Sequence, residues 1–225
     1  MELVKIGTVR SPFPEKFGIP RQSGLAEHVQ AEIVMEPEYR SPNAFRGITG
    51  FSHLWILWGF HKADGKKSLT VRPPRLGGNT KMGVFATRSP FRPNAIGLSV
   101  VRLSEIRQEE KRGTVLVVSG ADMLDGTPVY DIKPYIPYAD SVPDAVGGFT
   151  EYTAGYRLTV RISPEAESFW NGLAETERTA FTELLSGDPR PAYQENPERT
   201  YGMCFGEHEV HFKVASGVLT VLSGK

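Results

Sequence analysis

The first 140 or so residues of this chain alternate between short apolar runs and turns containing glycine or proline, and they carry no convincing helical pattern. The apolar runs are 3–9, 31–35, 51–60, 84–86, 95–106 and 114–119. About seven short strands with such turns are typical of a closed or nearly closed β-barrel. Alternating strand–helix units are absent, which argues against a doubly wound fold. The run FSHLWILWGF at 51–60 predicts a strand that is buried on both faces or is a core strand of the barrel.

The pattern changes after a linker that we place at residues 141–155. Residues 156–162 alternate as a strand, and Ser163-Pro164-Glu165 is a good helix start: a hydroxyl N-cap, a proline at the first helical position and an acid in the first turn. The helical pattern continues to Leu185, with a break expected around Gly172. Three further strands are expected at 200–205, 208–214 and 218–222. We therefore expect a mainly β chain with two domains, a barrel at 1–145 and a small α+β domain at 146–225.

The composition of the 225 residues is that of an ordinary globular protein, with 40% apolar and 23% charged residues. One cysteine, Cys204, excludes an internal disulfide and fits a reducing compartment. The N-terminus lacks the long apolar core of a signal peptide, and no run approaches the roughly 20 apolar residues of a membrane span. We expect a cytoplasmic protein that does not associate with membranes.

Charge is unevenly distributed although the net charge is zero. Residues 1–100 carry 14 basic and 7 acidic side chains, whereas residues 101–225 carry 12 and 19. Eight of the basic residues lie within 62–92, against the single acid Asp64. Such a basic face suits a polyanion, of which RNA is the obvious candidate, although a solvated lysine loop that binds nothing is a common alternative.

Two arginines, Arg88 and Arg92, lie in the segment GVFATRSPFRPNAIGL at 83–98. The apolar run 84–86 before them predicts the end of a buried strand, and a second strand follows them. Two X-Pro pairs between these strands stiffen the loop. The sequence therefore predicts two guanidinium groups on a rigid loop, a usual place for binding groups, unless they are simply solvated.

Several motifs of known chemistry are absent. The spacing around Gly59 and Gly65-Lys66-Lys67 is one residue too long for a phosphate loop, and no GxGxxG follows a strand. His208 and His211 would point to opposite faces of a strand, and the histidines and cysteine have no zinc-ligand spacing. No Gly-x-Ser-x-Gly elbow is present. We expect no metal site.

Polar side chains instead cluster at the ends of the predicted strands, so in a barrel several of them would meet at one rim. They are Arg21, Gln22, His61, Lys62, Arg88, Arg92, Asn94 and Asp125. Asp122 and Asp125 are suited to hydrogen-bonding a ribose, although plain turn chemistry also explains Asp125.

Four segments resemble the TsaA/TrmO family: PRQ at 20–22, GFSHLWILWGFH at 50–61, GVFATRSPFRPNAIGLS at 83–99 and DMLDGTPVYDIKPY at 122–135. The resemblance covers residues 3–145, and the C-terminal part is similar to the second domain of the longer bacterial members. It implies a β-barrel methyltransferase that depends on S-adenosylmethionine. It also implies a homodimer with the cofactor near the subunit interface. The implied substrate is a threonine tRNA carrying threonylcarbamoyl on adenosine 37, which is methylated on the exocyclic nitrogen.

The resemblance also assigns residues. Cofactor contacts are implied at Pro20, Arg21, Gln22, His61, Lys62, Arg88, Leu98, Asp125, Gly126, Thr127 and Pro128. Arg21 or Arg88 suits the methionine carboxylate of the cofactor. We expect Arg92, Asn94, Lys66 and Lys67 to contact the anticodon stem and loop, where bases are readable.

The chemistry of methyl transfer from a sulfonium is a one-step displacement, so the protein mainly supplies alignment. The acceptor nitrogen belongs to a urea-like group, and loss of its proton would help. Asp131 or Tyr135 is therefore a candidate general base. Two alternatives stay open: a non-enzymatic RNA-binding barrel, and a methyltransferase of the same fold with another acceptor.

Overall fold

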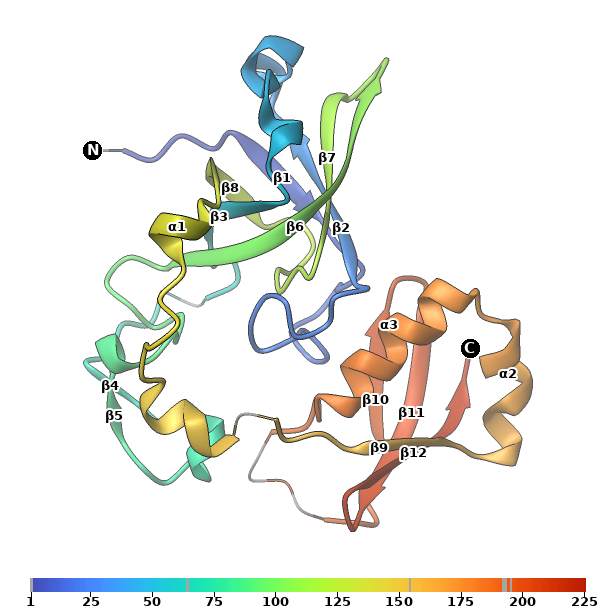
Figure 1. Cartoon of the computed structure of the whole chain (residues 1–225). Coiled ribbons are helices and arrows are strands. Elements are labelled where there is room, and N and C mark those ends of the chain that lie inside the picture. The colour runs from blue at the N-terminus through green and yellow to red at the C-terminus, as the bar shows by residue number, and fades with distance from the viewer. Residues whose placement is uncertain (1, 64, 154, 192–193, 195) are drawn as a thin grey trace.

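A computed structural model describes residues 2–63, 65–153, 155–191, 194 and 196–225, and its N-terminal part is a closed β-barrel (Figure 1). The strands are β1 (Gly7–Arg10), β2 (Gln30–Met35), β3 (His53–Gly59), β6 (Ile96–Glu109), β7 (Gly113–Ser119) and β8 (Pro128–Pro134). They follow one another around the barrel in the order β1-β2-β7-β6-β3-β8, and every neighbouring pair is antiparallel. The predicted barrel is thus confirmed.

Alternation along the strands fills the barrel with side chains. In β3, Leu54, Ile56 and Trp58 are buried in the barrel core, whereas Trp55 and Leu57 between them are only partly buried. Strand β3 is therefore a core strand of a barrel with one face inside, and its outer face is not covered as it would be in a doubly layered sheet.

Short helices and one small hairpin occupy the connections of the barrel. The 3-10 helices are η1 (Pro37–Tyr39), η2 (Pro42–Phe45), η3 (Ile48–Gly50), η4 (Pro74–Leu76), η5 (Val84–Ala86) and η6 (Gly148–Thr153). A single α-helical turn, α1 (Pro137–Asp140), follows β8. The basic excursion between β3 and β6 contains a two-stranded sheet, β4 (Thr70–Val71) with β5 (Met82–Gly83).

Two local predictions are wrong. The run 84–86 is the 3-10 turn η5 and not the end of a buried strand: the Thr87 N–H donates to the Val84 carbonyl at 3.2 Å. Val84 is buried but Phe85 is 74% exposed. A run of three apolar residues fits either conformation, so its pattern could not distinguish them. The first strand also begins later than expected, at Gly7.

The C-terminal part is a four-stranded sheet covered by helices. Its strands are β9 (Thr159–Ile162), β10 (Tyr201–Phe205), β11 (His208–Ala215) and β12 (Val218–Gly224), in the order β10-β11-β12-β9. The helices are η7 (Pro164–Ala166), α2 (Glu167–Gly172) and α3 (Glu175–Ser186), so the predicted break at Gly172 is present. The Ser163 side chain makes no capping bond to the helix, however, and its hydroxyl instead donates to the Leu222 carbonyl at 3.4 Å.

The long loop 11–29 joins the two parts. Phe13, Ala26 and Val29 belong to the hydrophobic core of the C-terminal sheet and helices, although they precede β2 of the barrel. The loop lies between the barrel and helix α3 (Figure 1). The His28 ring Nδ1 and the Glu183 carboxylate of α3 are 2.6 Å apart. Folding of the C-terminal part therefore orders a loop that belongs to the barrel by chain position.

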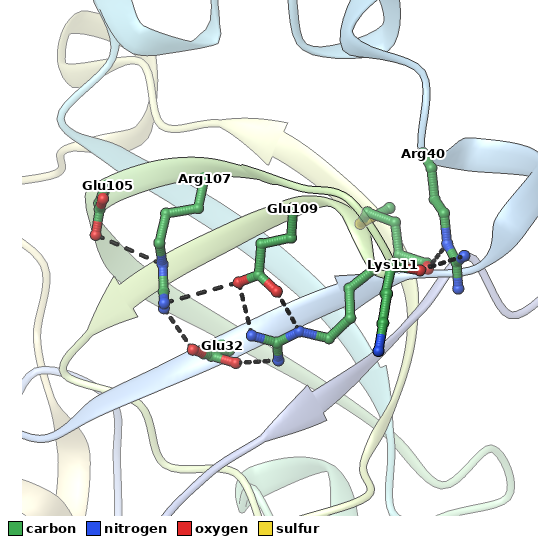
Figure 2. A network of polar contacts seen from close by, with 8 residues as sticks. Glu32, Arg40, Glu105, Arg107, Glu109 and Lys111 are labelled. Atoms are coloured by element: carbon green, nitrogen blue, oxygen red, sulfur yellow. Dashed lines mark hydrogen bonds and ion pairs between the residues drawn. The ribbon is translucent and has the colours of Figure 1, made fainter.

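An ion-pair network covers the outside of strands β2, β6 and β7 (Figure 2). Glu32 of β2 accepts hydrogen bonds from Arg107 and from Arg112, the latter at 2.6 Å. Arg112 also pairs with Glu109 across the turn between β6 and β7. Burial raises the pKa of Glu32, but the two arginines outweigh that effect and hold the pKa below its ordinary range. The network fixes the β6–β7 hairpin against β2.

No helix in the part of the chain that the structure describes is both long and apolar enough to cross a bilayer.

Candidate active site at one rim of the barrel

Three connecting segments meet at one end of the barrel. Strand pairing places Gln30 opposite Ser119, Gly59 opposite Ile96, and Thr8 opposite Pro128. The loops 11–29, 60–95 and 120–127 therefore emerge together, and we call this end the loop rim. The predicted cofactor residues from Pro20 to Gln22, His61, Lys62, Arg88 and Asp125 to Thr127 all lie in these loops. The loops that carry the expected side chains thus emerge at one rim.

The turn 125–128 is fastened to strand β1 and the loop after it. The Gly126 N–H donates to the Val9 carbonyl and the Asp125 N–H to the Phe13 carbonyl, each at 2.9 Å. Gly126 has φ +78°, a conformation that favours glycine. The Asp125 carboxylate accepts a hydrogen bond from the Ser11 N–H at 3.1 Å, and Arg10 approaches it at 3.5 Å. The turn is preset, with part of the carboxylate exposed.

From the end of β3, His61 reaches the same turn and Lys62 contacts loop 11–29. The His61 Nδ1 lies 3.4 Å from the Thr127 hydroxyl, and the Lys62 carbonyl accepts a hydrogen bond from the Lys16 ammonium at 2.6 Å. Burial and the neighbouring Lys62 charge lower the pKa of His61. The imidazole is therefore neutral at physiological pH and presents one donor and one acceptor.

Two arginines of the loop rim have different partners. Arg88 is exposed and donates to the Gln22 side-chain carbonyl, which links loop 60–95 to loop 11–29. The Arg21 guanidinium donates to the carbonyls of Asp188 and Arg190, at 3.3 and 2.8 Å. Arg21 thus ties loop 11–29 to the C-terminal part, whereas Arg88 presents its charge at the loop rim.

Arg92 closes its own loop. Its guanidinium donates to the carbonyls of Thr87 and Val84 at 2.7 and 3.2 Å, and it lies 5.7 Å from the centre of the Phe85 ring. The Arg92 guanidinium is therefore not simply solvated: it fastens its own loop through these hydrogen bonds. The side chains of Lys66, Lys67 and Asn94 are exposed.

The remaining predicted residues lie on the outer face of the barrel. Leu98 of β6 pairs with Leu57 of β3, which pairs with Asp131 of β8, and Leu98 is 54% exposed. The Asp131 carboxylate lies 3.1 Å from the Lys133 ammonium. Tyr135 follows β8 at the opposite end of the barrel, and its ring lies 5.9 Å from that of Trp55. About 13 Å of extended chain separates Asp131 from Tyr135, so the two are not brought together.

A buried polar chain behind the loop rim was not predicted. The Trp58 indole N–H donates to the Ser99 hydroxyl at 2.9 Å, and that hydroxyl donates to the Asp122 carboxylate at 2.6 Å. Asp122 is thus bound to the barrel interior, whereas its sequence position suggested a ribose contact. The signal available in the sequence was weak: a serine two residues after a glycine, in the apolar first part of β6.

Among the residues that the structure describes, no group of three or more His, Cys, Asp or Glu side chains is placed to hold a metal ion.

Comparisons with known proteins assign both parts of the chain. Residues 8–141 match the family model described as the tRNA-methyltransferase O N-terminal domain, and residues 155–223 match that of the TrmO C-terminal domain. The chain is 42% identical over 225 residues to the tRNA (adenine(37)-N6)-methyltransferase of Escherichia coli K12, covering 97% of this chain and 95% of the relative.

Two further relatives extend the comparison. A Pseudomonas aeruginosa protein whose name describes an S-adenosylmethionine-dependent methyltransferase, RcsF, is 44% identical over 213 residues, covering 92% of this chain and 90% of its own. The crystal structure of TrmO from Pseudomonas aeruginosa superposes with a TM-score of 0.80 at 35% identity, covering 100% of this chain and 98% of that one. With matching sequence, domain order and fold, the chain belongs to the tRNA-methyltransferase O family.

Proposed function

We propose that this tRNA methyltransferase transfers the methyl group of S-adenosylmethionine to the exocyclic nitrogen of N6-threonylcarbamoyladenosine at position 37 of threonine tRNA. The observation that carries the proposal is the loop rim, where the three sequence segments implied in cofactor binding lie in contact. Family membership decides against a non-enzymatic RNA-binding barrel. A different acceptor within the same chemistry is the alternative that the experiment below tests.

The side chains at the loop rim fit S-adenosylmethionine. Arg88 offers an exposed cation for the methionine carboxylate, and Asp125 offers an acceptor for a ribose hydroxyl. Leu98 offers exposed apolar surface for the adenine ring. Pro20, Arg21, Gln22, His61 and Lys62, with Gly126, Thr127 and Pro128, complete the proposed site. When bound, the cofactor supplies an electrophilic methyl group on its sulfonium.

The residues of the chain orient the acceptor and assist loss of its proton. Asp131 is the better candidate for the base, because its carboxylate is partly exposed on the outer face beside Leu98, across Leu57. Tyr135 lies farther along that face and suits a contact to the substrate or, in a dimer, to the neighbouring subunit's site. Alignment of the acceptor nitrogen with the methyl group supplies most of the rate enhancement.

The proposed tRNA surface is the basic excursion between β3 and β6. Lys66 and Lys67 are exposed there, and residues 62–92 contain eight basic residues but only one acidic residue. Asn94 is exposed at the end of the same loop. Arg92 holds the conformation of this loop by donating hydrogen bonds to the carbonyls of Val84 and Thr87. Phosphate contacts from such residues set the affinity for the anticodon arm, whereas the modified base is read at the loop rim.

A homodimer is proposed because several large apolar side chains are exposed on the connections of the barrel and on its outer face. They are Leu69, Phe85, Phe91, Leu98, Tyr138, Val142 and Val146. These side chains belong to the basic excursion, the start of β6 and the segment around α1. Exposed apolar side chains in such numbers support an interface between subunits. The cofactor would then lie near that interface.

We further propose that residues 1–145 carry the catalytic site and residues 146–225 form the small accessory domain. The C-terminal domain holds loop 11–29, which we call the cofactor loop, through Arg21 and through the core around Phe13. With tRNA as the substrate, we place the enzyme in the cytoplasm.

The test is a methylation assay with S-adenosylmethionine and two threonine tRNAs, one carrying threonylcarbamoyl on adenosine 37 and one without it. Nucleoside mass spectrometry reads the product. We expect one added methyl on the modified nucleoside only. Methylation of the bare tRNA, or of neither, would overturn the proposed acceptor, and a binding titration of the cofactor would then show whether the cofactor site stands.

A further inference from the structure

Asp122 lies at the junction of three segments that the proposed cofactor site uses. It belongs to the segment between β7 and β8, directly before the turn that carries Asp125. On its inner side its carboxylate accepts the hydroxyl of Ser99, which is 1% exposed and is itself fixed by the indole of Trp58. The carboxylate is therefore held in place from within the barrel.

On its outer side the same carboxylate reaches the cofactor loop. The backbone N–H of Ser23 hydrogen-bonds Asp122, and the positive charge of Arg88 acts on it. Ser23 directly follows Gln22, which accepts the hydrogen bond from Arg88. One residue farther on, the Gly24 N–H donates to the Gly120 carbonyl at 2.9 Å. The loop 11–29 and the loop that carries Arg88 thus converge on Asp122.

Three groups around the Asp122 carboxylate favour its ionised form: the Ser99 hydroxyl, the Ser23 N–H and the charge of Arg88. Burial acts against them and is the larger effect, so the pKa of Asp122 is raised. A partly buried carboxylate is costly unless such partners hold it. An asparagine has only one acceptor oxygen and no charge, so it cannot satisfy Ser99, Ser23 and Arg88 in the same way.

We propose that Asp122 is a positioning residue for cofactor binding, which sets the distance between Gln22 of the cofactor loop and the guanidinium of Arg88. The inference rests on the proposed function, because it takes these two segments as the cofactor site. Asp122 acts through its neighbours and needs no contact with the cofactor. Its effect is therefore on cofactor affinity rather than on the methyl transfer step.

The experiment measures binding of S-adenosylmethionine by titration calorimetry and, separately, kcat at saturating cofactor. Asp122→Asn is compared with wild type and with Glu110→Gln, a matched control on an exposed carboxylate in the turn between β6 and β7, at the end of the barrel away from the loop rim. We expect Asp122→Asn to raise Kd by about tenfold to a hundredfold, the usual effect of losing hydrogen bonds to a charged group. We expect kcat to stay close to that of wild type, and Glu110→Gln to bind as wild type does.

Ser99→Ala gives a second route to the same conclusion should Asp122→Asn fold poorly. It removes the inner partner of the carboxylate and leaves the charge, so we expect a smaller rise in Kd. Because both changes act through one link, the double variant should bind about as weakly as Asp122→Asn alone.

The outcomes separate the two proposals. Wild-type protein that does not bind S-adenosylmethionine overturns the proposed function. Wild-type binding with an unchanged Kd in Asp122→Asn, or in a folded Ser99→Ala should Asp122→Asn not fold, overturns the inference about Asp122 alone. A fall in kcat with unchanged Kd would also overturn it, because Asp122 would then act in the transfer step.

Discussion

Gly97 is a position where the barrel has no room for even one methyl group. A Cβ added there would lie within 2.6 Å of the indole carbon Cδ2 of Trp58, well inside the distance that real side chains keep. The indole cannot easily turn away, since Ser99 holds its N–H at 2.9 Å and the Phe60 ring lies 4.4 Å from it, centre to centre. Gly97→Ala must therefore displace Trp58.

The cost of Gly97→Ala follows from two contributions. Overpacking of a core costs about 1–3 kcal/mol, and a buried donor left without its acceptor costs about 1–3 kcal/mol. A chain of this size loses about 2–4 °C of unfolding midpoint per kcal/mol, so a total of about 2–6 kcal/mol predicts a fall of roughly 4–24 °C. Thermal unfolding followed by circular dichroism measures it.

Two companion variants make the test of Gly97→Ala specific. Gly83→Ala is the matched control, because a Cβ on Gly83 meets nothing within 4 Å and its φ of −59° suits alanine. Trp58→Phe combined with Gly97→Ala should lose less stability than the two single changes together, since the smaller ring makes room for the methyl group. A Gly97→Ala protein that unfolds at the wild-type temperature would refute the reasoning.

Three further predictions concern charge. Arg88→Ala should weaken S-adenosylmethionine binding at least about tenfold in calorimetry with little change in unfolding midpoint, because an exposed guanidinium contributes little to stability; equal affinity would remove Arg88 from the site. Lys66→Glu with Lys67→Glu should raise KM for tRNA several-fold and leave cofactor affinity unchanged, whereas unaltered tRNA kinetics would place the RNA surface elsewhere. Glu32→Gln should lower the unfolding midpoint by about 2–4 °C at neutral pH. The native fold lowers the pKa of Glu32, so the stability that its charge contributes is present above the ordinary glutamate pKa of 4.5 and is lost as pH falls through the lowered pKa. A difference in unfolding midpoint between wild type and Glu32→Gln that persists in acid would contradict the ion-pair account.

The barrel was accessible to sequence reasoning because five of its six strands, all but β8, lie in apolar runs between turns. The run 51–60 is the clearest case, and it became β3 within two residues at its start. The order of the strands around the barrel was not predicted, because it depends on pairings between distant segments. Local patterns said nothing of loop 11–29, since Phe13 packs against side chains beyond residue 158 in the sequence. Such packing depends on contacts that no local period encodes.

The candidate site was predictable in part. Strand ends and the resemblance selected Gln22, Arg88 and Asp125, which the fold brings to one rim. The sequence could not tell that the guanidinium groups of Arg21 and Arg92 are engaged by backbone carbonyls, because carbonyl positions depend on the folded loops. Nor could it show that Trp58 and Ser99 reach Asp122 through the barrel interior.

The loop 11–29 has a thermodynamic consequence. Its side chains complete the C-terminal core at Phe13, Ala26 and Val29, and its backbone shapes the loop rim. A ligand that orders this loop must therefore also favour the folded state of the C-terminal domain, even without touching it. By reciprocity, a change that loosens that distant core weakens affinity at the rim to the extent that it lowers the population of the ordered loop. Natural variation in the C-terminal core can thus tune cofactor binding while every residue of the site stays the same.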